Sequence, residues 1–292
     1  MKKNKIYALG FFDGVHLGHR ALLTACRAMA QEQDAVPAAI TFEKHPKSLF
    51  TPQVPLLINS ISDRQLLLRS QGIELLQVLP VTRDSMAQPW REFLEILVEN
   101  GATGFVCGDD FRFGHKGAGD GAALALFCQE KGLPWAIVPE QTLEGVRISS
   151  THIRNLIEAG QMQEAAKFLG HPHILSGEVT AGRQLGRTIG IPTANIRIPA
   201  GVVVPKQGVY ACKCTIDGKE YVAVTNVGNR PTVMGHEIRT ESWILHFEGD
   251  LYGRELTLEF HHFLRPEQKF GSLEDLKAQI HKDAAEAAQL LR

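Results

Sequence analysis

The sequence predicts two domains of different classes: an α/β domain with a parallel sheet, then a small antiparallel β-barrel with a C-terminal helix. Strand-like and helix-like segments alternate up to about residue 170, which is typical of a parallel sheet covered by helices. From residue 171 the pattern changes to short alternating runs separated by turn signals, as in a small barrel. The 292 residues are enough for two separate cores.

Composition argues against several classes of protein. Hydrophobic residues make up 44% and charged residues 22% of the chain, and the formal net charge is −1, so neither nucleic acid nor a membrane surface is an expected partner. No apolar run approaches the roughly 20 residues of a membrane helix. Asp13 and His16 interrupt the basic and apolar N-terminus, which argues against a signal peptide. We therefore expect a cytoplasmic protein, with its oligomeric state left open.

The five cysteines support the same location. They are odd in number, stand mostly inside apolar runs, and lack the CxxC spacing of a zinc site. Cys212 and Cys214 alternate along one face of a predicted strand. Reduced core cysteines in a cytosolic protein are the expected reading of this pattern.

The stretch from Leu9 to Arg20, LGFFDGVHLGHR, lies between a strand-like run and a helix-like segment. Its glycines let the backbone approach a ligand closely, and the free amides of a helix start favour anions. His16 and His19 are three residues apart, so on a helical turn both can donate hydrogen bonds to one phosphate. The alternative is a tight turn with two incidental histidines.

The other elements of the first half follow from periodicity and helix-end signals. We expect strands near residues 38–42, 75–79, 105–107 and 135–138, and helices near 62–71, 89–100 and 122–131. The helix at 89–100 has proline at its start, an apolar stripe, and glycine after its end. Because ligands bind beyond the carboxyl ends of parallel strands, the loops after strands are the expected site.

Two further loops of this kind carry suitable chemistry. Residues 108–121, GDDFRFGHKGAGDG, combine five glycines with charged side chains, which fits a nucleotide-contacting loop or a flexible solvated one. Residues 147–154, RISSTHIR, place helix-capping hydroxyls between two arginines, which fits a phosphate site or merely a well-capped helix. Walker A and GxGxxG sequences are absent, so phosphate binding would fall to these loops.

The second half is predicted to be a barrel closed by a helix. We expect strands near residues 210–216, 221–225, 243–247 and 256–263, with Asp217-Gly218 as a hairpin turn. A final helix begins at Ser272, and its apolar stripe is expected to pack on the core.

Polar stretches mark possible chemistry in this half. Residues 182–195, GRQLGRTIGIPTAN, can hold nucleotide phosphates and their Mg²⁺, since hard cations take oxygen ligands. Residues 226–233, NVGNRPTV, supply a second polar turn. Glu241 directly precedes a strand-like run, where it can be a general base at the barrel mouth or an exposed surface charge.

These motifs together resemble one family. LGFFDGVHLGHR resembles the HxGH signature of the nucleotidyltransferase superfamily, and its longer form, GxFDGVHxGH, resembles the bacterial bifunctional riboflavin kinase/FAD synthetases. GDDFRFG and RISSTHIR recur in the FAD synthetase half of that family, in the same order. LGRTIGxPTAN, GVYA, NxGxRPTV and DLYGR are similar to its riboflavin kinase module. The resemblance spans Leu9 to about Asp283.

The resemblance implies two domains and two reactions. Residues 1–170 would form an FMN adenylyltransferase (FAD synthetase) domain with a Rossmann-like parallel sheet, and residues 171–292 a riboflavin kinase domain with an antiparallel barrel. The kinase would phosphorylate riboflavin to FMN with ATP and Mg²⁺. The adenylyltransferase would convert FMN to FAD with a second ATP and release pyrophosphate.

The resemblance also implies site residues. For adenylyl transfer it implies catalytic His16 and His19, and nucleotide binding by Gly10, Phe12, Asp13, Gly14, Gly18, Asp110, Arg147, Ser150, Thr151 and Arg154. For the kinase it implies Glu241 as catalytic base and Thr193 and Asn195 at the metal, with nucleotide or flavin binding by Gly182, Gly186, Arg187, Thr188, Pro192, Asn195, Asn226 and Arg230.

The sequence departs from the family pattern at three places. Phe11 stands where a small or polar residue, often Asn, is usual; Ile191 stands where Phe is common; and Ser242-Trp243 replaces a different pair. The competing hypotheses are a single-activity enzyme whose other domain is inactive and a flavin-binding regulatory protein. Such a regulator would be expected to lose Glu241 or a motif histidine, and neither is lost.

Overall fold

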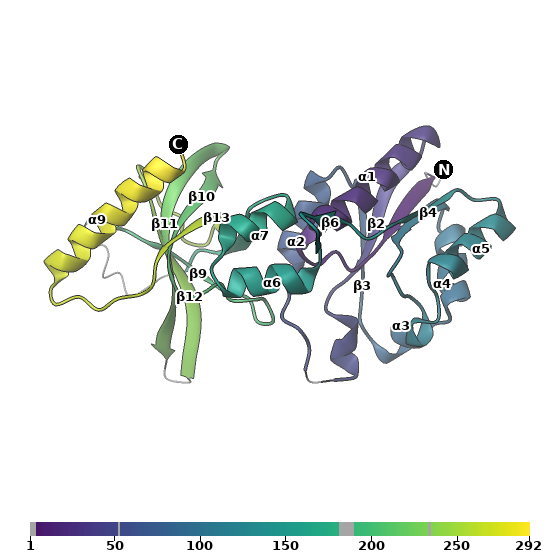
Figure 1. The fold of residues 1–292 in the computed structure, drawn as a ribbon, viewed down its shortest axis with the longest axis horizontal. Helices are drawn as coiled ribbons and strands as arrows, with labels where there is room; N and C mark the ends of the chain where they lie inside the picture. Colours follow the sequence, from purple (N-terminus) through teal and green to yellow (C-terminus); the bar gives the residue numbers. More distant parts are fainter. Residues whose placement is uncertain (1–3, 52, 181–189, 233–234) are drawn as a thin grey trace. The chain divides into compact units, whose positions relative to one another are not determined.

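A five-stranded parallel sheet forms the centre of the N-terminal part (Figure 1). The computed structural model describes residues 4–51, 53–180, 190–232 and 235–292. The strands lie in the order β3-β2-β1-β4-β5 and are β1 (Lys5–Leu9), β2 (Val36–Phe42), β3 (Leu75–Leu79), β4 (Ala102–Gly108) and β5 (Trp135–Val138). All four pairings are parallel, which confirms the predicted α/β class.

Helices bury this sheet because its strands are apolar on both faces. Tyr7 and Phe105 belong to a core that includes α4 (Trp90–Glu99) and α5 (Gly121–Lys131). Helix α1 (Leu17–Glu32) packs against β1, β2 and β4. Short elements complete this part: η1 (Asp13–Val15), η2 (Pro46–Leu49), η3 (His115–Gly117), β6 (Thr142–Leu143) and β7 (Val146–Arg147).

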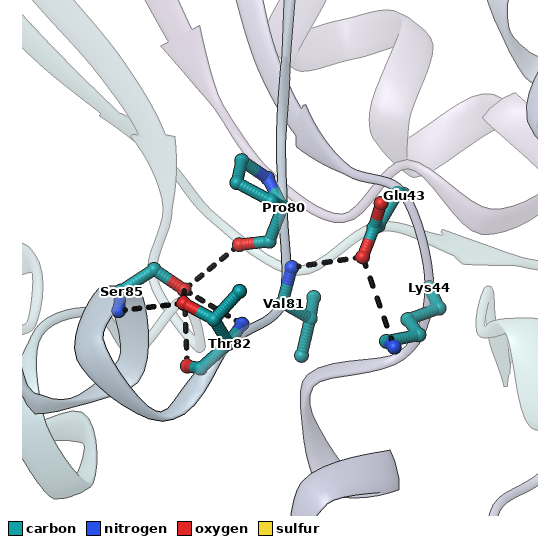
Figure 2. A network of polar contacts seen from close by, with 6 residues as sticks. All are labelled: Glu43, Lys44, Pro80, Val81, Thr82 and Ser85. Carbon is teal, nitrogen blue, oxygen red and sulfur yellow. Dashed lines mark hydrogen bonds and ion pairs between the residues drawn. The ribbon is translucent and has the colours of Figure 1, made fainter.

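Polar contacts fix the loops at the carboxyl ends of β2 and β3 (Figure 2). The Glu43 carboxylate, just after β2, accepts a hydrogen bond from the Val81 backbone N–H at 3.1 Å. Thr82 and Ser85 form a reciprocal capping box at the start of α3 (Arg83–Ala87). Hydrogen bonds therefore fix the loops at the edge of the sheet where the site is expected.

The C-terminal part is a six-stranded antiparallel sheet that nearly closes into a barrel. Its order is β8-β13-β10-β11-β12-β9, with β8 (His173–Glu178), β9 (Ala194–Arg197), β10 (Gly208–Ile216), β11 (Lys219–Thr232), β12 (Gly235–Ile244) and β13 (Glu255–Arg265). An isolated bridge between Thr180 and Asn195 brings the chain after β8 to β9. The predicted barrel is thus confirmed.

The turn and final helix of the barrel form as their residues predict. Asp217 and Gly218 join β10 to β11 with positive φ angles of 51° and 77°, the left-handed backbone that a two-residue hairpin turn needs. Ser272 caps α9 (Leu273–Leu290) by accepting from the Asp275 backbone N–H. Helix α9 packs against β10, β11 and β13.

Contacts divide the chain into two compact units. The first unit is Met1–Leu57 with Arg64–Ser150, and the second is Ile58–Asp63 with Thr151–Arg292. The second unit includes α7 (Met162–Leu169), which packs against β8 and β13. Helix α6 (Ser150–Glu158) begins in the first unit and continues in the second, and α2 (Ile61–Ser70) begins in the second and continues in the first.

All five cysteines are free and buried. Burial raises the pKa of Cys26 to about 11, and the pKa values of Cys107, Cys128 and Cys214 to about 12. Burial also raises the pKa of Cys212.

Among the helices of the described residues, none is both long enough and apolar enough to cross a membrane.

Candidate active sites

The HxGH loop leaves β1 through a tight left-handed turn. Phe12, Gly14 and Val15 all have positive φ angles, of 57°, 83° and 42°. Phe12 is fully buried, and a Cβ on Gly10 would lie 2.8 Å from its ring. Only glycine therefore fits at position 10 while Phe12 keeps its place under the turn.

The structure brings the two motif histidines face to face. His16 caps α1, with its Nδ1 accepting a hydrogen bond from the His19 backbone N–H at 3.3 Å. The two rings stack with centroids 3.6 Å apart. Gly18 belongs to the same turn, where a Cβ would lie 3.3 Å from the His16 ring. The close pair can present two ring donors to one anion.

The environment keeps the His19 ring neutral. Burial is the main cause that holds its pKa well below the ordinary value, and the charges of His16 and Arg64 act in the same direction. A neutral imidazole still donates one N–H, so His19 can hydrogen-bond a phosphate without carrying charge.

Other predicted residues of the adenylyl-transfer site are placed as follows. Asp13 is buried, and its backbone carbonyl accepts from Ser150 Oγ at 3.0 Å, which ties the RISSTHIR segment to the loop. Arg147 Nη2 lies 3.0 Å from Asp110 Oδ2 and also contacts the Glu140 carboxylate. This ion pair is exposed and contributes little stability, so Arg147 can exchange a carboxylate for a phosphate.

Thr151 and Arg154 stand on α6, one and four positions after Ser150. Both belong to the second unit.

Glu241 occupies the centre of the candidate kinase site. It pairs with Asn195 of β9 on one side and with Asn226 of β11 on the other, in antiparallel register. Directly paired residues point to the same face of a sheet. The three side chains therefore share one face, with Glu241 exposed on it.

The Asn195 side chain is buried and has one amide oxygen without a partner among the described residues. It is 3% exposed; Nδ2 donates to the Thr193 backbone oxygen at 3.3 Å, while Oδ1 has no partner among the described residues. An orphaned buried amide oxygen beside a threonine suits a hard cation such as Mg²⁺.

A pocket opens beside Thr193, but neither Asn195 nor Glu241 belongs to its lining. It brings the PTA stretch of the GRQLGRTIGIPTAN motif together with the DLYGR motif, although the two are far apart in sequence. Its lining consists of Val179, Pro192, Thr193, Ala194, Ser242, Ile244, Phe247, Gly249, Asp250, Leu251 and Tyr252. The predicted metal residue Thr193 and the nucleotide residue Pro192 therefore share one cavity.

Sequence reasoning missed two residues of these sites. Glu267 Oε1 accepts a hydrogen bond from Asn226 Nδ2 at 3.0 Å and lies against the Cα of Gly228. Glu267 stands in the loop before α9, where no sequence pattern predicts this contact. Arg64 is completely buried in the first unit. Its position three and four residues before Leu67 and Leu68 places it on the apolar side of α2, but that spacing does not predict the contacts that bury it.

Several predicted kinase residues are not described. Gly182, Gly186, Arg187 and Thr188 lie outside the described residues. The backbone of Arg230 lies in β11, opposite Glu237 of β12.

The departures from the family pattern have structural partners. Ile191 is buried, and Ser242 Oγ lies 2.9 Å from Thr225 Oγ1 in the barrel interior. Trp243 meets the His281 ring of α9 edge-on, at 5.3 Å between centroids. Phe11 lies under the Arg64 guanidinium, 4.5 Å from its ring centroid.

The fold and its two sites define a protein with two ATP-dependent flavin-modifying modules. Residues 1–152 match the FAD synthetase family, and residues 169–291 match the riboflavin kinase family. The chain belongs to the bifunctional riboflavin kinase/FMN adenylyltransferases. It phosphorylates riboflavin to FMN and adenylylates FMN to FAD, with ATP as co-substrate of both reactions.

Individual relatives extend over nearly the whole chain. The bifunctional riboflavin kinase/FMN adenylyltransferase of Listeria monocytogenes is 35% identical over 96% of this chain and 90% of its own. The protein of the same description from Escherichia coli K12 is 36% identical over 97% and 92%. A solved structure from Streptococcus pneumoniae, described as a macrolide-efflux protein, has a TM-score of 0.86 at 30% identity, covering 99% of this chain and 95% of its own.

Proposed function

We propose that the two reactions take place at separate sites: adenylyl transfer at the HxGH loop within residues 1–170, and riboflavin phosphorylation at Glu241 within residues 171–292. The stacked His16 and His19 pair supports the first assignment, and the row of Asn195, Glu241 and Asn226 supports the second. This row of three side chains is the observation that carries the proposal. It puts the Glu241 carboxylate between the amides of Asn195 and Asn226, and the Asn195 Oδ1 has no partner among the described residues.

At the kinase site, Glu241 accepts the proton of the ribityl 5′-hydroxyl as that oxygen attacks the γ-phosphate of ATP. A neutral hydroxyl is a poor nucleophile, so a positioned base is useful. Thr193 and the free Oδ1 of Asn195 would hold Mg²⁺, which when bound neutralises charge on the phosphates. Pro192 and Asn226, with Gly182, Gly186, Arg187, Thr188 and Arg230, complete the proposed nucleotide and flavin contacts.

At the adenylyl-transfer site, the phosphate of FMN attacks the α-phosphate of ATP and expels pyrophosphate. This nucleophile is already anionic, so no side-chain base is needed, and catalysis depends on alignment and charge stabilisation. His16, His19 and Arg147 supply donors to the phosphates. The turn made by Gly10, Phe12, Asp13, Gly14 and Gly18 positions the histidines, with Ser150 bonded to the Asp13 carbonyl and Asp110 paired with Arg147. Thr151 and Arg154 are included on the sequence pattern of α6.

We also propose that the protein works in the cytoplasm on small-molecule substrates, without nucleic acid or membrane partners. The support is chemical: all five cysteines are free and buried, which suits a reducing compartment.

Incubation with riboflavin, ATP and Mg²⁺, followed by chromatography of the flavins, tests the assignment of two sites when it is done on two variants. Glu241→Gln should make FMN from riboflavin more slowly, by about 10² or more, yet make FAD from supplied FMN. His19→Ala should make FMN and little FAD. If either variant loses both products while still folded, the two sites are not separate.

A further inference from the structure

Arg64 is a fully buried cation in the unit that contains the HxGH loop, with 0% of its surface exposed. Arginine is almost never fully buried unless it is paired, because removing a charge from water is costly. Its Nε and Nη2 have no hydrogen-bond partner among the described residues. The free-energy cost of desolvating this guanidinium suggests that Arg64 has a specific structural or functional role.

All described hydrogen bonds of Arg64 come from one nitrogen and join two strand ends. Nη1 lies 3.1 Å from the Phe11 backbone oxygen, 2.9 Å from the Phe42 backbone oxygen and 3.0 Å from Thr41 Oγ1. Phe42 is the last residue of β2, and Phe11 is the second residue after β1. Thr41 Oγ1 also donates to the Phe11 oxygen at 2.7 Å. The carboxyl ends of β1 and β2 are thereby clamped.

The same side chain fixes the ring that begins the loop. The Arg64 guanidinium stands 4.5 Å from the centroid of Phe11, and the His45 ring meets Phe11 edge-on at 5.1 Å. The next residue, Phe12, packs edge-on against His19 at 5.3 Å. A continuous set of contacts therefore leads from Arg64 through Phe11 and Phe12 to His19.

Arg64 also contributes charge at this place. It acts on His19 as a positive neighbour, and the buried Asp13 is its own negative neighbour. Because two of its nitrogens are unpaired, the positive charge is only partly compensated. A partly compensated cation beside the loop favours the anionic phosphates that the loop receives.

We propose that Arg64 is a positioning residue for adenylyl transfer, clamping the ends of β1 and β2 and setting the loop that presents His16 and His19. The inference rests on the proposed assignment of that loop to FAD formation. Arg64 does not touch substrate in this role and acts through the Phe11 backbone and ring.

Three variants of the full-length chain test the role. Arg64→Met keeps the volume but removes charge and donors, and is expected to lower kcat for FAD formation from FMN by about 10², with KM for ATP changed only a few-fold. Arg64→Lys keeps a cation with three donors and should recover kcat to within about tenfold of the wild type. Arg69→Met, on the exposed side of the same helix, is the matched control and should behave as the wild type.

Riboflavin phosphorylation by each variant is the internal reference and should be unchanged. A wild-type kcat for FAD formation in Arg64→Met overturns the proposal, as does failure of Arg64→Lys to recover any of the loss. If Arg64→Met does not fold, Phe11→Leu removes the ring beneath the guanidinium, and a kcat within twofold of the wild type then overturns it. His19→Ala, assayed in parallel, separates the two proposals: normal FAD formation by that variant rejects the assignment of the loop itself.

Discussion

Glu241 of β12 lies directly opposite Asn195 of β9 in the antiparallel register, so a candidate base and a candidate metal ligand share one face of the barrel. The two residues are 46 positions apart in sequence. The antiparallel pairing of β9 with β12 brings them together.

Replacement of Glu241 by Gln keeps the size of the side chain but removes its ability to accept a proton. We expect riboflavin phosphorylation to slow by about 10² or more, because a general base contributes roughly 10²–10⁴-fold. FAD formation from supplied FMN should persist, and steady-state rates of the two half-reactions measure both. Glu255→Gln, an exposed carboxylate of β13, is the control. Wild-type kinase turnover in Glu241→Gln would return Glu241 to a surface charge.

Replacement of His19 by Ala removes one of the two stacked rings. We expect FAD formation to fall by about 10²–10³, the usual cost of losing one preorganised donor at developing charge. Riboflavin phosphorylation should stay near normal, since that reaction is assigned to the barrel. Separate assays of FMN and FAD production check this, and an equal loss in both would contradict the assignment.

Replacement of Asn195 by Ala removes the orphaned Oδ1. We expect the Mg²⁺ concentration that half-activates the kinase to rise by about tenfold, in line with the cost of losing groups that support a metal site. A titration of kinase rate with Mg²⁺ at saturating riboflavin measures the shift. An unchanged titration curve would place the cation elsewhere.

A fragment of residues 172–292 should fold and make FMN but no FAD, and a fragment of residues 151–292 should do the same with higher thermal stability. The longer fragment keeps α7, whose Met162, Ala165, Phe168 and Leu169 are buried. Loss of about 1 kcal/mol of this packing lowers the Tm of a unit of this size by roughly 3 °C or more. Calorimetry of both fragments checks the difference; equal Tm values would mean that α7 does not stabilise the barrel.

The barrel should lose stability as pH falls from about 6.5, because His173 is buried without partners for either ring nitrogen. Burial, and then the charge of His171, lowers its folded pKa to about 3, so the unfolded chain binds the extra proton first. With an unfolded pKa of about 6.5, the loss at pH 5 is roughly 2 kcal/mol. Denaturant unfolding at pH 7 and pH 5 measures it.

His173→Phe is the matched control for this pH effect, since the neighbouring Phe260 ring shows that the site accepts aromatic packing. The difference between the two proteins should be present at pH 5 and smaller at pH 7. An identical pH dependence in both would assign the effect to other groups.

The sequence predicted the fold class and most of the local pattern because these depend on short-range signals. Alternating apolar segments marked the strands of the parallel sheet and β10, β11 and β13 of the barrel, Asp217-Gly218 marked a hairpin, and Ser272 marked a helix start. The strand expected near 243–247 was misplaced, because β12 spans Gly235–Ile244, and β8 and β9 were not predicted. The motif spacing likewise foretold the proximity of His16 and His19.

Long-range contacts were beyond such signals. The hydrogen bond between Glu267 and Asn226 joins residues that no local pattern relates. Arg64 looked like an ordinary charge on a helix, since its burial depends on the ends of β1 and β2. Which of the two units takes α7 depends on its packing against β8 and β13, which the sequence pattern does not encode.

The buried thiols have a practical consequence. A thiolate is the reactive form of cysteine, and burial that raises the pKa of a thiol also shields it from reagents. Cys26, Cys107 and Cys128 lie in the first unit, and Cys212 and Cys214 in the second. The rate at which each cysteine of the native chain is alkylated therefore reports how often its core opens. Mass spectrometry of the labelled peptides identifies which of the two cores opens more often.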